Sequence, residues 1–292
     1  MSEMVFNPAT LMLNAIAAAE ARQASEPTSG KDYKDAEGLL VCGECNQRKQ
    51  MQLDVPLVGV RVVPVLCACG IARRDAEEAA AEAARRQQRI NELRMAGILT
   101  RDHLGMTFDA DDGSNPKMAT VGRNYVEHWR EIKQQPAPGL LLTGGVGGGK
   151  TFWAACIANA MIDRGYSALI TNIPTLIQQM AEDFERNKRR ILDNIAGVDL
   201  LVLDDVGFER QTEYAAEKMF EIIDARYLSK RPLIVTTNLS FTEMENPSRM
   251  EYKRVFDRII GMTRPVIVEA DGRRKRIAQE SSRQMDKLLG LS

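Results

Sequence analysis

A glycine-rich stretch in the middle of the chain has the composition and spacing of a phosphate-binding loop. Residues 144–151 read GGVGGGKT, which fits the pattern G-x-x-x-x-G-K-[ST] between an apolar stretch and a helical one. Glycines let the backbone curl so that its N–H groups face phosphate oxygens at the positive end of the helix. In this pattern the lysine reaches the β- and γ-phosphates and the hydroxyl coordinates Mg²⁺, which indicates ATP and Mg²⁺ as cofactors. The residues predicted to bind nucleotide are Gly144, Gly145, Val146, Gly147, Gly148, Gly149, Lys150, Thr151 and Phe152, with Thr151 also a magnesium ligand.

Two later apolar stretches end in polar residues that could serve the same site. Residues 200–203 are all apolar and lead to Asp204, predicted to bind magnesium, and to Asp205, predicted to orient the attacking water. Many P-loop ATPases have glutamate at the second position, and the shorter aspartate predicts slower hydrolysis. Residues 233–236 lead in the same way to Asn238, which we expect near the γ-phosphate. A simple asparagine turn is the alternative for Asn238.

Four of the five cysteines fall close together in the first quarter of the chain. The cysteine pairs Cys42-x-x-Cys45 and Cys67-x-Cys69 are separated along the chain by about as many residues as the two cysteine pairs of a zinc ribbon. A β-rich stretch lies between them. Because thiols in a cytosolic protein stay reduced, a Zn²⁺ site with four thiolates is predicted rather than disulfides. Two unrelated cysteine pairs are the alternative. A redox role has less support, because no thioredoxin-like pattern surrounds the first pair.

The elements that must position these residues alternate between strands and helices, which predicts a doubly wound α/β domain with a parallel sheet. The expected strands cover residues 140–143, 167–171, 200–203, 233–236 and 265–269. The helices between them are expected to start near Lys150, Pro174, Thr212 and Pro247.

The N-terminal part has a different pattern. Asn7-Pro8 is expected to start a helix, and the polar residues 25–35 form a linker. A long exposed helix follows Gly70 and closes at Gly97, and another helix is expected at 118–133. The predicted domains are therefore an N-terminal helix and linker (1–34), a small zinc-ribbon-like module with the long helix (35–97), and a P-loop ATPase domain (98–292).

The composition is that of an ordinary globular protein. Of 292 residues, 44% are hydrophobic, and 39 Lys and Arg nearly balance 40 Asp and Glu. These values exclude disordered, collagen-like and coiled-coil classes. No apolar run approaches the roughly 20 residues of a membrane span, and the start of the chain lacks the basic residues of a signal peptide, so we expect a cytoplasmic protein without membrane contact. Nucleic-acid binding would have to come from local basic clusters.

The motifs together resemble one family. The P-loop, the VLDDVG strand end, the strand ending in Thr-Thr-Asn and the helix KRVFDR at 253–258 are similar to those of the DnaC/DnaI-type replicative helicase loaders, which are AAA+ ATPases of bacteria and phages. The resemblance covers about residues 100–275. It implies that Arg258 is an arginine finger for ATP on a neighbouring subunit and that Arg254 is a second cation on the same helix face. Arg274 matches a late arginine of the family, with plain surface charge as the alternative.

The resemblance also implies contact with single-stranded DNA through basic residues. The candidates are Arg186, Lys188, Arg189 and Arg190, with Phe184 as a stacking partner. A solvated helix end explains these residues equally well. The run 273–276 is a second basic candidate.

The leading hypothesis is an ATP-dependent loader that delivers a replicative DNA helicase onto single-stranded DNA and self-associates into an ATPase oligomer. In such proteins the small N-terminal module holds the helicase. An IstB-like transposition helper ATPase is one alternative. A nucleotide-gated adaptor that scarcely hydrolyses ATP is the other, because of Asp205.

Overall fold

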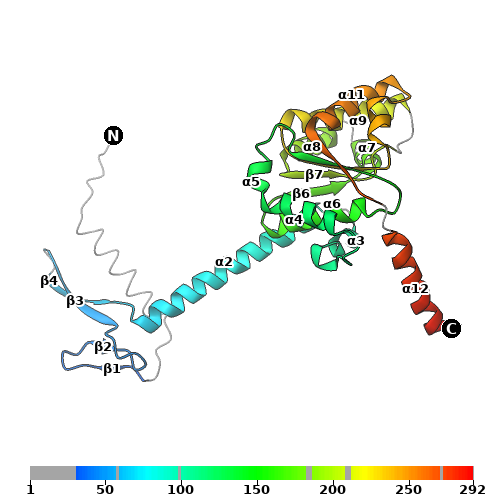
Figure 1. Ribbon diagram of the computed structural model, residues 1–292. Coiled ribbons are helices and arrows are strands. Elements are labelled where there is room, and N and C mark those ends of the chain that lie inside the picture. Colours follow the sequence, from blue (N-terminus) through cyan, green and yellow to red (C-terminus); the bar gives the residue numbers. More distant parts are fainter. Residues whose placement is uncertain are drawn as a thin grey trace, which may run out of the picture. The chain divides into compact units, whose positions relative to one another are not determined.

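A computed structural model describes residues 31–56, 59–97, 100–181, 186–207, 212–269 and 272–291 of the chain (Figure 1). The helix expected after Asn7 and the ring of Phe184 lie outside these residues. The chain divides into two compact units, Met1–Arg85 and Arg86–Ser292. The division falls inside the long helix α2 (Ala68–Gly97). Within the described ranges, no helix combines the length and the apolar character needed to cross a membrane.

The first unit contains two small antiparallel sheets. Strand β1 (Tyr33–Lys34) pairs with β2 (Leu40–Val41), and β3 (Gln50–Val55) forms a hairpin with β4 (Gly59–Pro64). The sequence interpretation placed the residues of β1 in a linker, whereas they pair with β2. Among its described residues, this unit buries few apolar side chains besides cysteines: Leu39, Val41, Val55 and Val63.

The second unit is built on a five-stranded parallel sheet, which confirms the predicted fold class. Its strands are β5 (Gly139–Thr143), β6 (Ala168–Thr171), β7 (Leu200–Leu203), β8 (Leu233–Thr237) and β9 (Thr263–Ile267), in the order β6-β7-β8-β5-β9. Strand β9 begins two residues before its predicted start at Pro265. Proline is tolerated there because β9 lies at an edge of the sheet, where a missing N–H leaves fewer ladder bonds unmade.

Both faces of this sheet are buried. Along β5, Leu140 and Leu142 pack into one apolar cluster and Leu141 into the other, because successive side chains of a strand point to opposite faces. Figure 1 shows α4 (Pro116–Glu127) and α6 (Lys150–Asp163) on one face and α9 (Glu213–Ser229) and α11 (Met250–Met262) on the other. The continuous apolar strands of the sequence follow from this double coverage.

Two segments that were each predicted to form one helix form two helices instead. The helix expected at 118–133 is divided into α4 and α5 (Trp129–Ile132), because His128 leaves helical geometry at φ −92°, ψ 23° and ends α4. The single helix expected near Pro174 is two, α7 (Ile173–Ala181) and α8 (Arg186–Gly197). The remaining described helices are α3 (Arg101–Gly105), the short 3₁₀ helix η1 (Phe108–Ala110), α10 (Phe241–Glu245) and α12 (Arg273–Leu289).

A fully buried arginine of α9 ties α8 to the strands that follow it. The Arg226 guanidinium donates to the carbonyl oxygens of Ile195 and Val198 at 2.8 Å and of Asp199 at 3.0 Å. Its Nε donates to the carbonyl oxygen of Pro232 at 3.2 Å. Carbonyls at a helix end carry partial negative charge, so this cation satisfies acceptors that would otherwise be buried alone.

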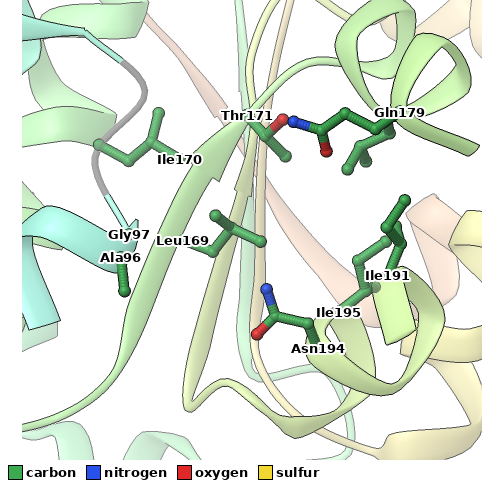
Figure 2. A pocket seen from close by; sticks show the side chains of 10 residues that line it. Ala96, Gly97, Leu169, Ile170, Thr171, Gln179, Ile191, Asn194 and Ile195 are labelled. Atoms are coloured by element: carbon green, nitrogen blue, oxygen red, sulfur yellow. The ribbon is translucent and has the colours of Figure 1, made fainter. Parts of the chain in front are cut away.

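The end of α2 lies against the edge strand β6. Figure 2 shows Ala96 and Gly97 on one side of Leu169, with Ile191 and Ile195 of α8 on its other side, around a cavity of about 290 Å³. A Cβ at position 97 would collide with the carbonyl oxygen of Ala168. Glycine therefore permits this close approach.

Candidate active site and cysteine cluster

The glycine-rich loop lies between the carboxyl end of β5 and the amino end of α6. Gly144, Gly147 and Gly149 have φ angles of 142°, 84° and 83°, a region that L-residues with side chains seldom adopt. A Cβ at position 144 would also collide with the carbonyl oxygen of Val268. The glycines are therefore required by the curled backbone, and the loop leads directly to Lys150 as the first residue of α6.

The ammonium group of Lys150 connects the loop with the end of β8. Its Nζ donates to the carbonyl oxygens of Gly144 at 2.9 Å and Gly145 at 2.8 Å, and to Oδ1 of Asn238 at 2.6 Å. Asn238 in turn donates from Nδ2 to Oδ1 of Asp205 at 3.3 Å. Asn238 therefore stands between the lysine and the second aspartate, 88 residues along the chain from Lys150.

Two hydroxyl groups converge on a single oxygen of Asp204. Thr151 donates to Oδ1 at 2.8 Å, and Thr236 donates to the same atom at 2.6 Å. The Thr236 hydroxyl also accepts the backbone N–H of Asp205 at 2.8 Å. A carboxylate and a hydroxyl side by side are oxygen ligands of the kind that Mg²⁺ prefers, so the residues fit the metal. Thr236 is not one of the site residues predicted from the sequence, although it stands at the end of a predicted strand.

The backbone of Asp205 explains why an aspartate occupies this position. Its φ is 56°, in the left-handed region. Asp and Asn adopt that region more readily than residues with longer side chains. A glutamate here would add backbone strain, so the shorter carboxylate follows from the turn after β7.

A cavity of about 750 Å³ adjoins these groups, a size suited to a nucleotide. It is lined by Val146, Gly147, Gly149, Lys150, Thr151, Phe152, Asp204, Asp205, Thr236 and Asn238. A second wall comes from α3 and the segment after it: Arg101, Asp102, Gly105, Met106 and Ala110. None of these five residues is predicted from the sequence to belong to the site. The one signal was that the family resemblance begins near residue 100, before the P-loop strand.

Arg258 and Arg254 do not line this cavity. Arg258 forms an ion pair with Asp224 of α9, with Nη2 and Oδ1 2.9 Å apart. Its guanidinium lies over the ring of Phe220, 4.3 Å from the centroid. Arg254 is exposed one helical turn earlier on α11. Neither arginine therefore lines the cavity beside the glycine-rich loop of its own chain.

The basic cluster at residues 186–190, between β6 and β7, is only partly exposed. Lys188 forms an ion pair with Glu221 at 2.9 Å, and Arg189 lies 3.9 Å from Asp193. Arg189 and Arg190 are exposed. The side chains of Arg186 and of the run 273–276 lie outside the described part of the structure.

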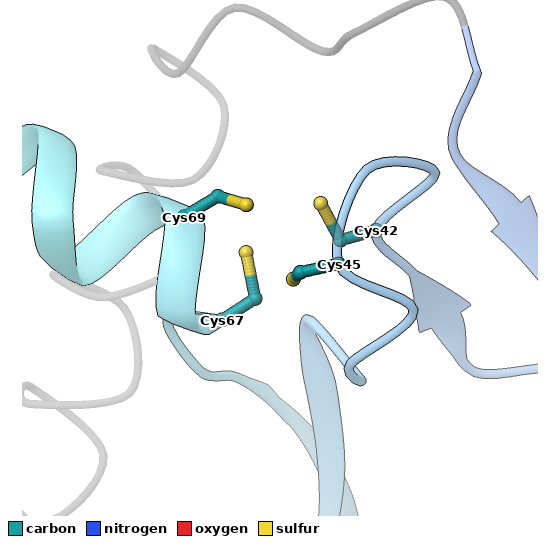
Figure 3. Close-up of side chains that lie close together, drawn as sticks. All are labelled: Cys42, Cys45, Cys67 and Cys69. Atoms are coloured by element: carbon teal, nitrogen blue, oxygen red, sulfur yellow. The ribbon is translucent and has the colours of Figure 1, made fainter.

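The four clustered cysteines converge on one point (Figure 3). Their sulfur atoms all lie within 4.8 Å of one another, and the side chains of Cys42 and Cys67 are buried. A tetrahedral zinc with Zn–S bonds of about 2.3 Å separates its sulfurs by roughly 3.8 Å, so the cluster fits Zn²⁺. Backbone hydrogen bonds at Cys69 and Gln47 lower the pKa of Cys45 to about 6.

A buried ion pair fixes the turn that carries the first two cysteines. Asp32 accepts the backbone N–H of Gly43 at 3.1 Å and pairs with Lys49 at 3.0 Å. Asp32 precedes β1, so residues that the sequence analysis assigned to a linker hold the cysteine turn in place.

Comparison with known proteins agrees with the resemblance. The replicative helicase loader DnaC of Escherichia coli (strain K12) is 31% identical over 159 residues, which are 53% of this chain and 62% of that protein. The loader DnaI of Bacillus subtilis (strain 168) is 24% identical over 200 residues, 64% of each chain. A putative insertion sequence ATP-binding protein of Sinorhizobium fredii is 30% identical over 149 residues, 49% of each chain. The chain thus spans less than two thirds of the length of these relatives.

A family model covers a longer part of the chain. The model described as "IstB-like ATP binding protein" matches residues 75–281, which contain the P-loop, both aspartates, Asn238 and the arginines of α11. This match extends over more than two thirds of the sequence, and we conclude that the chain belongs to the family of IstB-like ATP-binding proteins.

Proposed function

We propose that this chain is a Mg²⁺-dependent ATPase that binds a replicative DNA helicase and delivers it onto single-stranded DNA. One observation carries the proposal: Lys150, Asp204 and Asn238 line one nucleotide-sized cavity, in a chain whose relatives include named replicative helicase loaders. The geometry supports the ATPase part, and the relatives support the helicase part.

The proposed roles follow from the contacts. Lys150 exchanges its carbonyl acceptors on the loop for oxygens of the β- and γ-phosphates. Thr151 and Asp204 hold Mg²⁺, which neutralises charge on the phosphates when it is bound. Asp205 orients the attacking water. Asn238 bonds to both the lysine and this carboxylate and so holds them at a fixed separation.

Hydrolysis is proposed to take place between copies of the chain. Arg258 would reach the γ-phosphate of a neighbour, with Arg254 as a second cation, and both side chains stand apart from their own cavity. An arginine that neutralises transition-state charge is worth orders of magnitude in rate. ATP turnover would then depend on self-association.

The first unit is proposed to contain a structural zinc site and to contact the helicase. Cys42, Cys45, Cys67 and Cys69 would hold Zn²⁺, which supplies folding free energy to a unit with few buried apolar residues. The partner module of residues 35–97 stays a prediction.

Contact with single-stranded DNA is proposed through Arg189 and Arg190, which are exposed. Arg186 belongs to the same predicted cluster. Lys188 would have to leave Glu221 before it could bind a phosphate, so we expect it to contribute least.

The decisive experiment is co-purification with the replicative helicase of the host in ATP and in ADP. We expect a complex whose yield depends on the nucleotide, and a Lys150→Ala variant that no longer responds to the nucleotide. Failure to recover helicase in either nucleotide, with the protein folded, would refute the loader function.

A transposition helper ATPase is the second candidate function. The matching family model and the insertion-sequence relative favour it. Recovery of a transposase, and not of the helicase, in the same pull-down would select this function.

A nucleotide-gated adaptor with little hydrolysis is the third candidate, suggested by Asp205. ATP turnover with and without single-stranded DNA decides here. Substantial DNA-stimulated turnover that is lost in Arg258→Ala eliminates the adaptor.

A further inference from the structure

One face of α9 surrounds the guanidinium of Arg258. Phe220, Asp224 and Tyr227 are spaced four and three residues apart and so share a helix face. The Arg258 guanidinium lies 4.3 Å from the ring centroid of Phe220 and 5.5 Å from that of Tyr227. Asp224 pairs with Nη2 at 2.9 Å. The two rings and the carboxylate therefore contact the guanidinium together and restrict where it can lie.

This arrangement is not needed to join the two helices. Helices α9 and α11 already share a buried apolar cluster that includes Met219, Ile222, Ile223, Val255, Phe256 and Ile259. The Arg258 and Asp224 side chains are 28% and 30% exposed, and partly exposed ion pairs contribute little to stability. The contacts have a different consequence, which is to order a long and otherwise mobile side chain.

Asp224 Oδ1 lies 2.9 Å from Nη2 of the Arg258 guanidinium. Arginine has five N–H donors in a rigid fork, and one carboxylate accepts at most two of them in a bidentate pair. The partial exposure of the side chain leaves part of this fork open to solvent. A phosphate oxygen of a neighbouring copy could therefore be met without breaking the pair.

We propose that Asp224 and Phe220 are the positioning residues of Arg258, and that they fix the direction in which its guanidinium meets the nucleotide of a neighbouring copy. The inference deepens the proposed function and rests on it. Catalysis tolerates little displacement, because a misplacement of about 1 Å can cost about a hundredfold in rate. Because the side chain is already ordered in the folded protein, the entropy cost of ordering it does not add to the activation free energy.

The test is a mixed-subunit ATPase assay with Asp224→Asn, which removes the charge and keeps the size. We expect this variant to lower kcat by about tenfold to a hundredfold while KM for ATP stays the same. The matched control is Glu217→Gln, which removes one exposed negative charge from the same helix and should keep full turnover. Asp224→Glu, which keeps the charge, should recover part of the rate.

Mixing identifies the subunit on which Asp224 acts. Asp224→Asn mixed with Lys150→Ala should regain turnover, because one partner supplies an intact pocket and the other an intact arginine. Asp224→Asn mixed with Arg258→Ala should not, because every interface then has a displaced or missing guanidinium. Recovery in this second mixture would overturn the inference, since Asp224 would then act on its own subunit's pocket.

Failure of the inference can be told apart from failure of the proposed function. If Arg258→Ala is slow and Asp224→Asn is as fast as the unchanged chain, only the inference is overturned. If Arg258→Ala turns over ATP at the full rate, the function proposed for Arg258 fails and the inference fails with it. If Asp224→Asn unfolds at a lower temperature, Phe220→Leu replaces it in the same mixtures, with the same expected results.

Discussion

The two units of the chain differ in how much apolar surface surrounds their candidate sites. The first unit buries four apolar side chains besides cysteines in its described part, and two of its four clustered cysteines are buried as well. The second unit packs two extensive apolar clusters on opposite faces of a sheet, and its candidate active site lies at the carboxyl ends of the strands. In the first unit a metal would be part of the core. In the second, the core is complete and the ligand is bound beside it.

This difference teaches two ways of placing reactive side chains. A small unit that cannot bury enough apolar surface needs a cross-link or a metal to order its loops. A large parallel sheet orders loops through the rigid ends of its strands, and Asp204 and Asn238 follow β7 and β8 directly. The first unit should therefore lose its fold when its metal is removed, whereas the second unit should keep its fold when its ligand is removed.

Zinc removal should have the largest effect, and only on the first unit. Structural zinc supplies about 10 kcal/mol or more in small domains. We expect about one zinc per chain, and Cys67→Ser should abolish it and remove hydrogen-exchange protection from β3 and β4. Protection in the second unit should not change.

The matched control is Cys156→Ala, which removes the buried thiol of the second unit. This variant should retain the metal. Metal-free protein with a protected β3–β4 hairpin would contradict both the zinc site and the contrast between the units.

Loss of the buried arginine should be the next largest effect, and only in the second unit. Arg226→Met would leave the carbonyl oxygens of Ile195, Val198 and Asp199 buried without this donor. Each buried acceptor left without a donor costs about 1–3 kcal/mol, so a loss of about 3 kcal/mol or more is expected. Chemical denaturation of the second unit should show this loss while the zinc content stays constant. A change in stability of less than about 1 kcal/mol would show that Arg226 is dispensable.

Lys150→Ala should weaken ATP binding and leave both folds intact. The lost charge-assisted contacts to the phosphates correspond to about 3 kcal/mol, or about a hundredfold in affinity. Calorimetric titration with MgATP measures this effect, and Lys117→Ala, at an exposed lysine of α4, serves as the control. Unchanged affinity would place the nucleotide elsewhere.

The smallest effect should come from Asp205→Glu. A longer side chain at φ 56° should cost about 1 kcal/mol of folding free energy in the second unit. Asp205→Asn tolerates this backbone and should keep the stability while lowering ATP turnover. If the Asp205→Glu variant proved as stable as the unchanged chain, the turn would not be the reason for an aspartate here.

The sequence was sufficient for features that depend on local pattern. The apolar run 200–203 predicted a buried strand with the bounds of β7, and the glycine-rich loop predicted the start of α6 at Lys150. Periodicity and turn chemistry act over a few residues, so one sequence displays them directly. The division of the 118–133 helix at His128 was missed because a single residue of non-helical geometry leaves no mark on an otherwise helical pattern.

Features that depend on contacts between distant segments could not be predicted in this way. Met106 lines the nucleotide cavity from a segment before the P-loop strand, and Arg226 meets carbonyls of α8 and of the turns beside β7 and β8. Neither residue stands in a recognisable motif. Their roles follow from which backbone groups the sheet order brings near them.

The sequence by itself determined the types of chemistry: a P-loop for phosphates, two aspartates after a buried strand, and four thiols at metal-ligand spacing. Tertiary structure decided which of these groups act together. It joined Lys150 to Asn238 and Thr236 to Asp204 by hydrogen bonds. It also paired Arg258 with Asp224, away from the cavity of its own chain, and Lys188 with Glu221. The physical reason is that hydrogen bonds and ion pairs act over a few ångströms. Only the packing of strands and helices brings residues far apart in the chain within that range.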